Sequence, residues 1–389
     1  MPYLDNFSEN WTAKEARHLL KRTSFGITEM LVSEAVSLGL SGTIDQLFDQ
    51  SPLPEPPLKY RLDGTGDDEI IDPDANYGET WINGLPIPTA ATNQEKNKIL
   101  NSRTRSLYAW SFLQMQNAGI SIREKLTLFW HNHFVAENVN PHREFFYINI
   151  LRTNALGNFK ELTKQITTDP NMLLYLSGSQ NSNTAPNENY SRELLELFSI
   201  GKGDAVGNGD YTNYTEDDVI QMAKALTGWR VRDLNNPETL TAFFSNNKHT
   251  SGEKNLSHRF NNAVISENGE NEYKDLIDKI FEQEECSKFI TRQLYIWFVN
   301  VEISEEIETH IIEPLAEVIR DHNYEIVPAL KILLSSEHFF ENTFCMIKSP
   351  IDLMLSATKS LLLSAPTTSI LEEYEFSLIL HLATSDVGQ

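Results

Sequence analysis

The chain has 389 residues, and its 55 Asp and Glu outnumber its 32 Lys and Arg, which gives a formal net charge of -23. A surface this acidic repels the phosphates of DNA and RNA and anionic lipid at long range, so we expect neither nucleic acid nor a membrane as a partner. Hydrophobic residues make up 40% of the chain, with 20 Phe, 13 Tyr and 6 Trp, which is enough for a packed core and excludes general disorder.

The start of the chain and its two cysteines bear on the compartment. The opening MPYLDNFSENWTAKEARHLLKR has no apolar run between a basic start and a cleavage site, so it does not resemble a signal peptide. The sequence contains no run of about 18 apolar residues, so no transmembrane helix is expected. Cys286 and Cys345 could pair, but nothing in the sequence demands it, and neither has the CxxC spacing of a zinc site. A cytoplasmic location is the default expectation.

Helical periodicity and helix-start signals run through most of the chain. Capping boxes are predicted at Thr12–Glu15 and Ser121–Glu124, and a weaker form at Thr215–Asp218. Pro314 is expected to kink or split the helix that contains it. In chain order we expect helices near 13–22, 29–38, 42–50, 94–117, 122–135, 142–155, 158–167, 187–200, 216–227, 271–283, 285–299, 305–321, 325–335, 350–364 and 370–383.

Two stretches lack this periodicity. The segment 51–91 is rich in Pro, Gly and Asp and is expected to be a long irregular surface excursion. The segment 228–268 holds Gly, Asn and Ser with short apolar pieces, which favours a small β-hairpin or short strands. The predicted fold class is therefore mainly α: a multi-helix globular protein, one large domain over 1–389, with a small β insertion near 228–268.

A histidine-rich stretch, FWHNHFVAENVNPHREF, is the first candidate site. His131, His133 and His142 with neighbouring acids such as Glu144 are compatible with a divalent metal site. On a helix, His133 shares the apolar side, while His131 lies about 200° round, so both could bind one metal only where the helix ends or deforms. The alternative is a buried histidine hydrogen-bonded to a backbone carbonyl, beside two solvent-facing histidines.

The segment from Pro186 to Trp229 is the second candidate. Glu188, Arg192 and Glu196 follow at i, i+4 and i+8 and so share one helix face. They are compatible with an intrahelical ladder of ion pairs or, with Asn189 and Glu193 beside them, with a polar site. The candidate catalytic residues are therefore His133, Glu193, Arg192, Asn189 and Glu188.

Two loops carry further candidates. DAVGNGDYTNYTEDD holds oxygen donors near glycines, but its spacing fails the EF-hand pattern, so a glycine-rich loop is favoured over a calcium site. In KHTSGEK, His249 and Lys254 could reach a shared cleft, and a solvated loop is the default interpretation. No GxSxG, P-loop or GxGxxG motif supports a lipase-like, nucleotide-hydrolysing or dinucleotide-binding protein.

Several long motifs, in order, resemble those of one bacterial family, the DUF1800 family, whose name marks its function as unknown. The motifs are ARHLLKRTSFG from Ala16, EKLTLFWHNHFV from Glu124, LRTNALGNFKELTKQITTDPNMLLYL from Leu151, PNENYSRELLELFSIG from Pro186, YTEDDVIQMAKALTGW from Tyr214, and KSPIDLM from Lys348. The resemblance implies that more sequence usually follows the C-terminal LHLATSDVGQ, so we expect the C-terminal part of the domain to be missing. It also implies that many relatives are exported, from which the absence of a signal peptide departs.

Two functions remain open. The leading hypothesis is a hydrolase with a His, Glu and Arg cleft, because these groups can run acid–base or metal-assisted attack by water. The alternative is a non-catalytic helical scaffold. The resemblance implies a partner for it, because relatives are often encoded beside a sulfatase-like or phosphatase-like protein. Beyond the possible divalent metal, the sequence names no cofactor.

Overall fold

The computed structural model describes residues 2–61, 71–90, 92–137, 140–232, 241–343, 346–361 and 363–385. The described residues are mainly helical, which confirms the predicted fold class. The α-helices are α1 (Ala13–Thr23), α2 (Glu29–Leu47), α3 (Asn93–Asn117), α4 (Arg123–His133), α5 (Pro141–Thr153), α6 (Phe159–Thr167), α7 (Pro170–Tyr175), α8 (Asn189–Glu193), α9 (Glu216–Ala225), α10 (Glu272–Phe281), α11 (Glu284–Phe298), α12 (Glu305–Ile307), α13 (Glu313–Asp321), α14 (Val327–Ser335), α15 (Glu337–Glu341), α16 (Pro350–Ser360) and α17 (Ile370–Ser385).

Local signals explain most of these boundaries. Thr12 and Glu15 form the predicted capping box of α1, and Thr215 and Asp218 form that of α9. At α4 the predicted box is wrong. Its N-cap is Ile122, without a side-chain bond, because the Glu124 carboxylate is drawn into a buried salt bridge instead.

Three of the predicted helical stretches differ from regular α-helices. The helix predicted over 305–321 divides into α12, a π-helical turn η9 (Glu308–Ile312) and α13, just ahead of Pro314. The helix predicted over 187–200 divides into α8 and a second π-helix, η4 (Leu194–Ser199). The separate helices predicted on either side of Gly39 run together as α2, with a kink at Gly39, where φ is 73°.

Three two-stranded antiparallel sheets complete the fold. β3 (Trp229–Val231) pairs with β4 (Ala242–Phe244), and β5 (Lys254–Asn255) pairs with β6 (Val264–Ile265), both inside the predicted β insertion. The third pair, β1 (Ala205–Gly207) with β2 (Asp210–Tyr211), was not predicted. The dipeptide Asn208–Gly209 at its turn is a strong hairpin signal.

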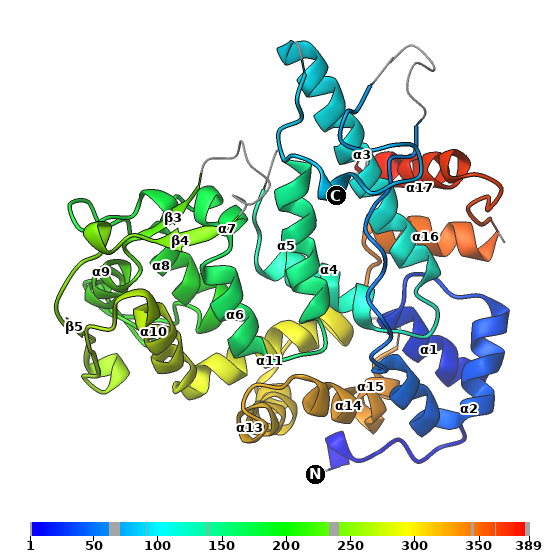
Figure 1. Ribbon diagram of the computed structural model, residues 1–389. Helices are drawn as coiled ribbons and strands as arrows, with labels where there is room; N and C mark the ends of the chain where they lie inside the picture. Colours follow the sequence, from blue (N-terminus) through cyan, green and yellow to red (C-terminus); the bar gives the residue numbers. More distant parts are fainter. Residues whose placement is uncertain are drawn as a thin grey trace.

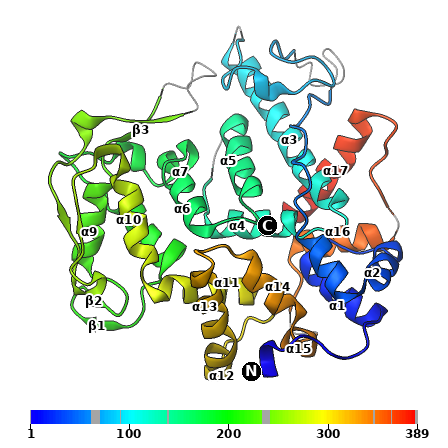
Figure 2. The ribbon, with the colours of Figure 1, turned by 60° about the horizontal axis from the view of Figure 1, so that its bottom comes forward.

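The two views agree on the arrangement of the helices. α4, α5 and α6 lie in the middle of the molecule, with α8, α9, α10 and the hairpins on one side (Figures 1 and 2). On the other side α1 and α2 lie beside α16, and α17 packs against α3. The largest hydrophobic cluster runs through the middle from Leu19 past Trp130 and Phe159 to Leu333.

The irregular segment near the N-terminus is held more tightly than expected. Residues 51–61 and 71–90 contain little regular structure, apart from a short 3-10 turn, η2 (Trp81–Asn83). Yet Tyr60 and Trp81 are buried in a second hydrophobic cluster that also includes residues of α3 and α17. The guanidinium of Arg103 on α3 is buried and donates hydrogen bonds of 2.7 Å to both carboxylate oxygens of Asp72. This part of the predicted surface excursion is therefore anchored in the interior; residues 62–70 and 91 lie outside the described residues.

Two sequence expectations concern membrane-spanning helices and the cysteines. No helix in the described part of the chain combines the length and the apolar character that a membrane crossing requires. Cys286 is a buried free thiol, and burial raises its pKa well above the ordinary value. The pairing considered for it falls on Cys345, which lies outside the described residues.

Candidate functional site

His133 lies in an aromatic setting. Its ring contacts the rings of Phe129, Trp130, Phe134, Phe159, Phe198 and Phe289. Nε2 lies 3.0 Å from the carbonyl oxygen of Phe198 in the π-helix η4, so a neutral ring donates its proton there. Burial lowers the pKa of His133 to about 4. His133 therefore matches the alternative to a metal ligand: a buried histidine that is hydrogen-bonded to a backbone carbonyl oxygen.

His142, the first-turn residue of α5, is fully buried and fastens α5 to the segment around Trp81. Its Nε2 lies 3.1 Å from the Trp81 carbonyl oxygen, and the two rings meet edge to face. Burial, and then the charge of Arg103, lower the pKa of His142 to about 4. The neutral, buried imidazole of His142 therefore has a structural role, because it links α5 to the segment around Trp81.

His131 belongs to a different group. It is about one third exposed, and its Nε2 lies 3.4 Å from Oε1 of Glu144 on α5. The other carboxylate oxygen of Glu144 accepts a hydrogen bond of 3.3 Å from the Asn171 side chain on α7. Together with Arg143 and Asp169 these residues make up what we call the polar junction: His131, Arg143, Glu144, Asp169 and Asn171.

The three histidines therefore bond to three different partners. Within the described residues, no group of three or more His, Cys, Asp or Glu side chains is placed to hold a metal ion. The predicted metal site at His131, His133 and His142 receives no support from these contacts.

Asp169 is the buried member of the polar junction. It is the N-cap of α7, with Pro170 at the first helical position, and its Oδ1 accepts the backbone N–H groups of Asn171 and Met172 at 2.7 and 3.3 Å. Burial raises the pKa of Asp169 to about 7, and the nearby charge of Glu144 acts in the same direction. Near neutral pH this carboxyl group is consequently both a proton donor and a proton acceptor.

Two buried tyrosine hydroxyl groups and a guanidinium lie near enough to interact electrostatically with that carboxyl group. Tyr147 donates to the Phe134 carbonyl oxygen, and the Tyr190 hydroxyl lies 2.8 Å from Oγ1 of Thr167. Burial raises the pKa of both tyrosines, with a further contribution from the charge of Asp169. Burial also lowers the pKa of Arg143, against the attraction of Asp169 and Glu144. The polar junction thus combines an imidazole, two acids and a cation at the contact between α4, α5 and α7.

The ladder on α8 lies elsewhere and is built as an ion-pair network. Arg192 binds Glu216 on α9 through both terminal nitrogens, at 3.0 and 2.7 Å. Glu188 lies 3.4 Å from Arg192 and Glu196 3.6 Å from it, as the helical spacing predicts. The partner across the helix pair, Glu216, was not foreseen. Its hydrogen bond and charge raise the pKa of Arg192.

The two remaining candidates on α8 differ from this ladder. Glu193 is half-buried, and it forms no hydrogen bond or ion pair within the described residues; burial, followed by the charge of Glu196, raises its pKa. Asn189 donates from its side chain to the Leu176 carbonyl oxygen at 3.3 Å. In the part of the chain that the structure describes, neither residue forms a hydrogen bond to the polar junction.

His249 and Lys254 are buried although most of the KHTSGEK segment between them is exposed, so the solvated-loop interpretation is wrong for these two side chains. His249 lies 2.9 Å and Lys254 2.5 Å from the carboxylate of Glu272 on α10, and all three side chains are almost fully buried. Nδ1 of His249 lies 2.8 Å from the Thr227 carbonyl oxygen. This triad ties the β insertion to α9 and α10.

The loop considered for calcium forms the β1–β2 hairpin instead. Its Asp210 carboxylate binds Nε of Arg259 at 3.0 Å. An acid already paired with an arginine favours the structural interpretation of this loop over a cation site.

The polar junction includes three residues that the sequence interpretation missed: Arg143, Asp169 and Asn171. One usable signal was present. Asp-Pro is the pattern of an N-cap followed by the first helical residue, and it would have predicted α7 and placed the Asp169 side chain at its start. The contacts themselves join segments 13 and 27 residues apart, so no local pattern could have indicated them.

Comparison with known proteins gives one match. The family model described as Protein of unknown function (DUF1800) matches residues 18–382. No curated protein and no solved structure matches the chain. Because the match extends to residue 382, it gives no support to the expected loss of the C-terminal part of the domain.

Proposed function

The chain belongs to the DUF1800 family, and from its polar junction we propose that it is a hydrolase that works by general acid–base chemistry. One observation carries the proposal. His131, Glu144 and Asn171 meet at a partly exposed point beside the buried Asp169, although they come from three separate segments. Hydrolysis needs a group that takes a proton from water and a group that returns one to the leaving atom, and such an arrangement supplies both.

Four members of the polar junction have a role in this proposal. Asp169 takes the proton of the attacking water, since its pKa of about 7 leaves it partly ionised near neutral pH. His131, oriented by the Glu144 carboxylate, protonates the leaving group. Arg143 stabilises the negative charge that develops on the substrate. The earlier set of His133, Glu193, Arg192, Asn189 and Glu188 has less support, because His133 is occupied by a carbonyl oxygen and Arg192 by Glu216.

The test is a panel of chromogenic p-nitrophenyl esters, phosphates, sulfates and glycosides. We expect turnover of one class, and a loss of at least about 100-fold in kcat/KM for Asp169→Asn, as for the removal of a general base. The rate should rise as pH increases through about 7, where Asp169 becomes ionised. The matched control is Glu282→Gln, which should keep full activity. Glu282 is an exposed acid that accepts a hydrogen bond from Lys279. Turnover that is equal in Asp169→Asn and the wild type would exclude the proposed role.

A second candidate function is that of a partner protein. Large apolar side chains are exposed along the C-terminal helices: Leu353 on α16 is 61% exposed and Ile379 on α17 is 62% exposed. A contact site is expected where such side chains form one continuous apolar surface. We propose a sulfatase-like or phosphatase-like protein as the partner for this alternative. The test is to co-express the two proteins and to measure whether they co-purify. Leu353→Asp and Ile379→Asp are expected to abolish the complex.

A further inference from the structure

A polar pocket opens between the end of the π-helix η4 and the start of α11. Its volume is about 310 Å³, and it is lined by Ile200, Thr212, Asn213, Arg259, Gln283 and the first turn of α11. This volume lies at the lower end of the range of small-molecule sites, about 300–1,000 Å³. None of the residues that line it belongs to the polar junction, so the pocket is a separate feature of the molecule.

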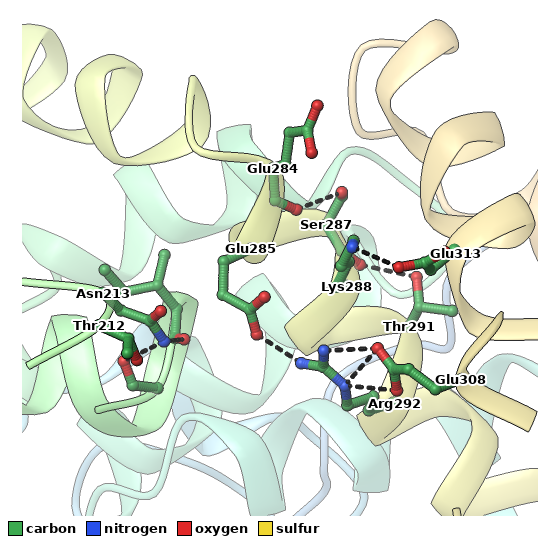
Figure 3. A network of polar contacts seen from close by, with 12 residues as sticks. Thr212, Asn213, Glu284, Glu285, Ser287, Lys288, Thr291, Arg292, Glu308 and Glu313 are labelled. Carbon is green, nitrogen blue, oxygen red and sulfur yellow. Dashed lines mark hydrogen bonds and ion pairs between the residues drawn. The ribbon is translucent and has the colours of Figure 1, made fainter. Parts of the chain in front are cut away.

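The walls of the pocket are fixed by their own hydrogen bonds. The Asn213 side-chain nitrogen donates to the carbonyl oxygens of Ile200 and Gly201, at 2.8 and 3.1 Å. On the opposite wall Glu285 is held by Arg292, which also binds Glu308 on η9 (Figure 3). A wall that is already ordered loses little entropy when a ligand binds.

Most charges around the pocket are already compensated by protein groups. Lys288 binds Glu313 at 2.7 Å, and Glu285 binds Arg292 at 2.5 Å (Figure 3). Arg259 binds Asp210 through Nε. An anionic ligand would have to displace one of these partners or lie beside the carboxylate of Glu284, which also lines the pocket and forms no ion pair within the described residues. A neutral ligand meets neither obstacle.

Several hydrogen-bonding groups of the pocket remain available. Within the described residues, no hydrogen bond is formed by Oδ1 of Asn213, by the Gln283 side-chain amide or by the terminal nitrogens of Arg259. Donors and acceptors are therefore mixed in one small volume. Hydroxyl groups donate and accept at once and so match such a mixture, whereas an apolar ligand would leave these groups unpaired.

From this geometry we propose that the pocket binds a small, neutral, polyhydroxylated ligand, of the chemical class of a monosaccharide or the terminal sugar of a glycan. Asn213, Gln283 and Arg259 form its hydrogen bonds, and Ile200 contacts its apolar face. Within the described lining no aromatic ring is available for stacking, so the affinity is expected in the millimolar range, about 1 mM.

The test uses the whole chain and four neutral sugars: glucose, galactose, mannose and N-acetylglucosamine. Ligand-observed saturation-transfer NMR, followed by titration, should detect saturable binding of at least one sugar. Gln283→Leu is the main variant, because within the described residues this side chain makes no hydrogen bond and caps no helix N–H. It should weaken binding about tenfold, as the loss of one to two hydrogen bonds predicts.

Two controls sharpen the result. Glu282→Gln changes the neighbouring, exposed residue outside the pocket and should leave sugar binding unchanged. Asp169→Asn should also leave it unchanged, which separates this proposal from that of hydrolysis at the polar junction. Inorganic phosphate and glycine serve as charged and zwitterionic probes. The proposal is overturned if no sugar binds at about 100 times the expected Kd, if Gln283→Leu binds as the wild type does, or if phosphate or glycine binds in place of the sugars.

Discussion

At the scale of single residues, Asp169 combines two demands that conflict. Its side chain caps α7, which favours a carboxylate near the helix start, yet it is buried near Glu144, which disfavours the charge. The raised pKa of Asp169 expresses this conflict. Groups that are kept in an unfavourable state are characteristic of functional sites, where stability is given up for activity.

The first prediction is therefore a gain of stability in Asp169→Asn. Asparagine caps a helix as well as aspartate does, and it carries no charge to desolvate. The folded pKa of about 7 lies above the model value of 3.8, so the folded protein binds the proton more tightly, and its stability falls as pH rises from about 4 to 7. The variant should exceed the wild type by about 2–4 kcal/mol at pH 8.

Urea denaturation at pH 4.5, 6 and 8 measures this difference. The advantage of Asp169→Asn should shrink as pH falls below about 7, because the folded wild type then becomes protonated and no longer buries a charge. A wild type that is more stable than the variant at pH 8 would mean that the carboxylate is well compensated and that the stated conflict does not exist.

At the scale of elements, an irregular helical turn positions a backbone group for a contact between helices. The π-helix η4 directs the Phe198 carbonyl oxygen to His133, which joins α4 to the segment after α8. π-helical turns occur often at functional sites, but here the turn serves packing. On α8 the ladder is likewise structural, because Arg192 reaches across to α9.

The second prediction distinguishes the two neighbours on α8. Arg192→Met should cost about 1 kcal/mol, because its ion pairs are one third exposed and screened by water. Glu193→Gln should be neutral or slightly stabilising, since burial raises the pKa of Glu193 and its carboxylate forms no ion pair within the described residues. Urea denaturation of both variants at pH 7 measures the effects. A loss of several kcal/mol for Glu193→Gln would reveal a partner that the contacts do not include.

The third prediction concerns the turn before β3. Gly228 has φ +97°, and an added Cβ would lie 2.9 Å from the Phe244 ring and 3.1 Å from the Ser245 carbonyl oxygen. Gly228→Ala should therefore cost about 2–4 kcal/mol, from backbone strain and from the close contacts together. Gly252→Ala is the matched control, because Gly252 also has positive φ, at +83°, but faces open space. Its cost should be about 1 kcal/mol. Equal losses in thermal melts of the two variants would show that the close contacts do not matter.

At the scale of the whole molecule, the charge of -23 bears on partners. A strongly acidic protein is repelled by polyanions unless a basic groove is present. The sequence has no dense run of Lys or Arg, and several of the basic side chains described here are already paired with acids within the fold.

The fourth prediction follows from that charge. The protein should not shift a DNA or RNA duplex in a mobility-shift experiment at about 150 mM salt, and lowering the salt to about 50 mM should not induce binding. Binding that strengthens as salt is lowered would show a basic surface that the charge count conceals.

The sequence alone determined the features that depend on neighbours in the chain. Apolar periodicity and capping boxes placed most helices, such as α1 and α9, because the hydrogen bonds involved span three or four residues. The long motifs indicated the family, and the family model confirms it. The short helix α7 and the β1–β2 hairpin were missed although their signals, Asp-Pro and Asn-Gly, are local.

Only the tertiary structure decided which polar residues share a site. His131 and His133 stand two positions apart, yet one meets Glu144 and the other a carbonyl oxygen inside an aromatic cluster. Periodicity indicates which way a side chain faces, but the group it meets comes from another helix. The burial that raises the pKa of Asp169, like the meeting of Lys254 with Glu272, arises from packing between distant segments and has no counterpart in local sequence.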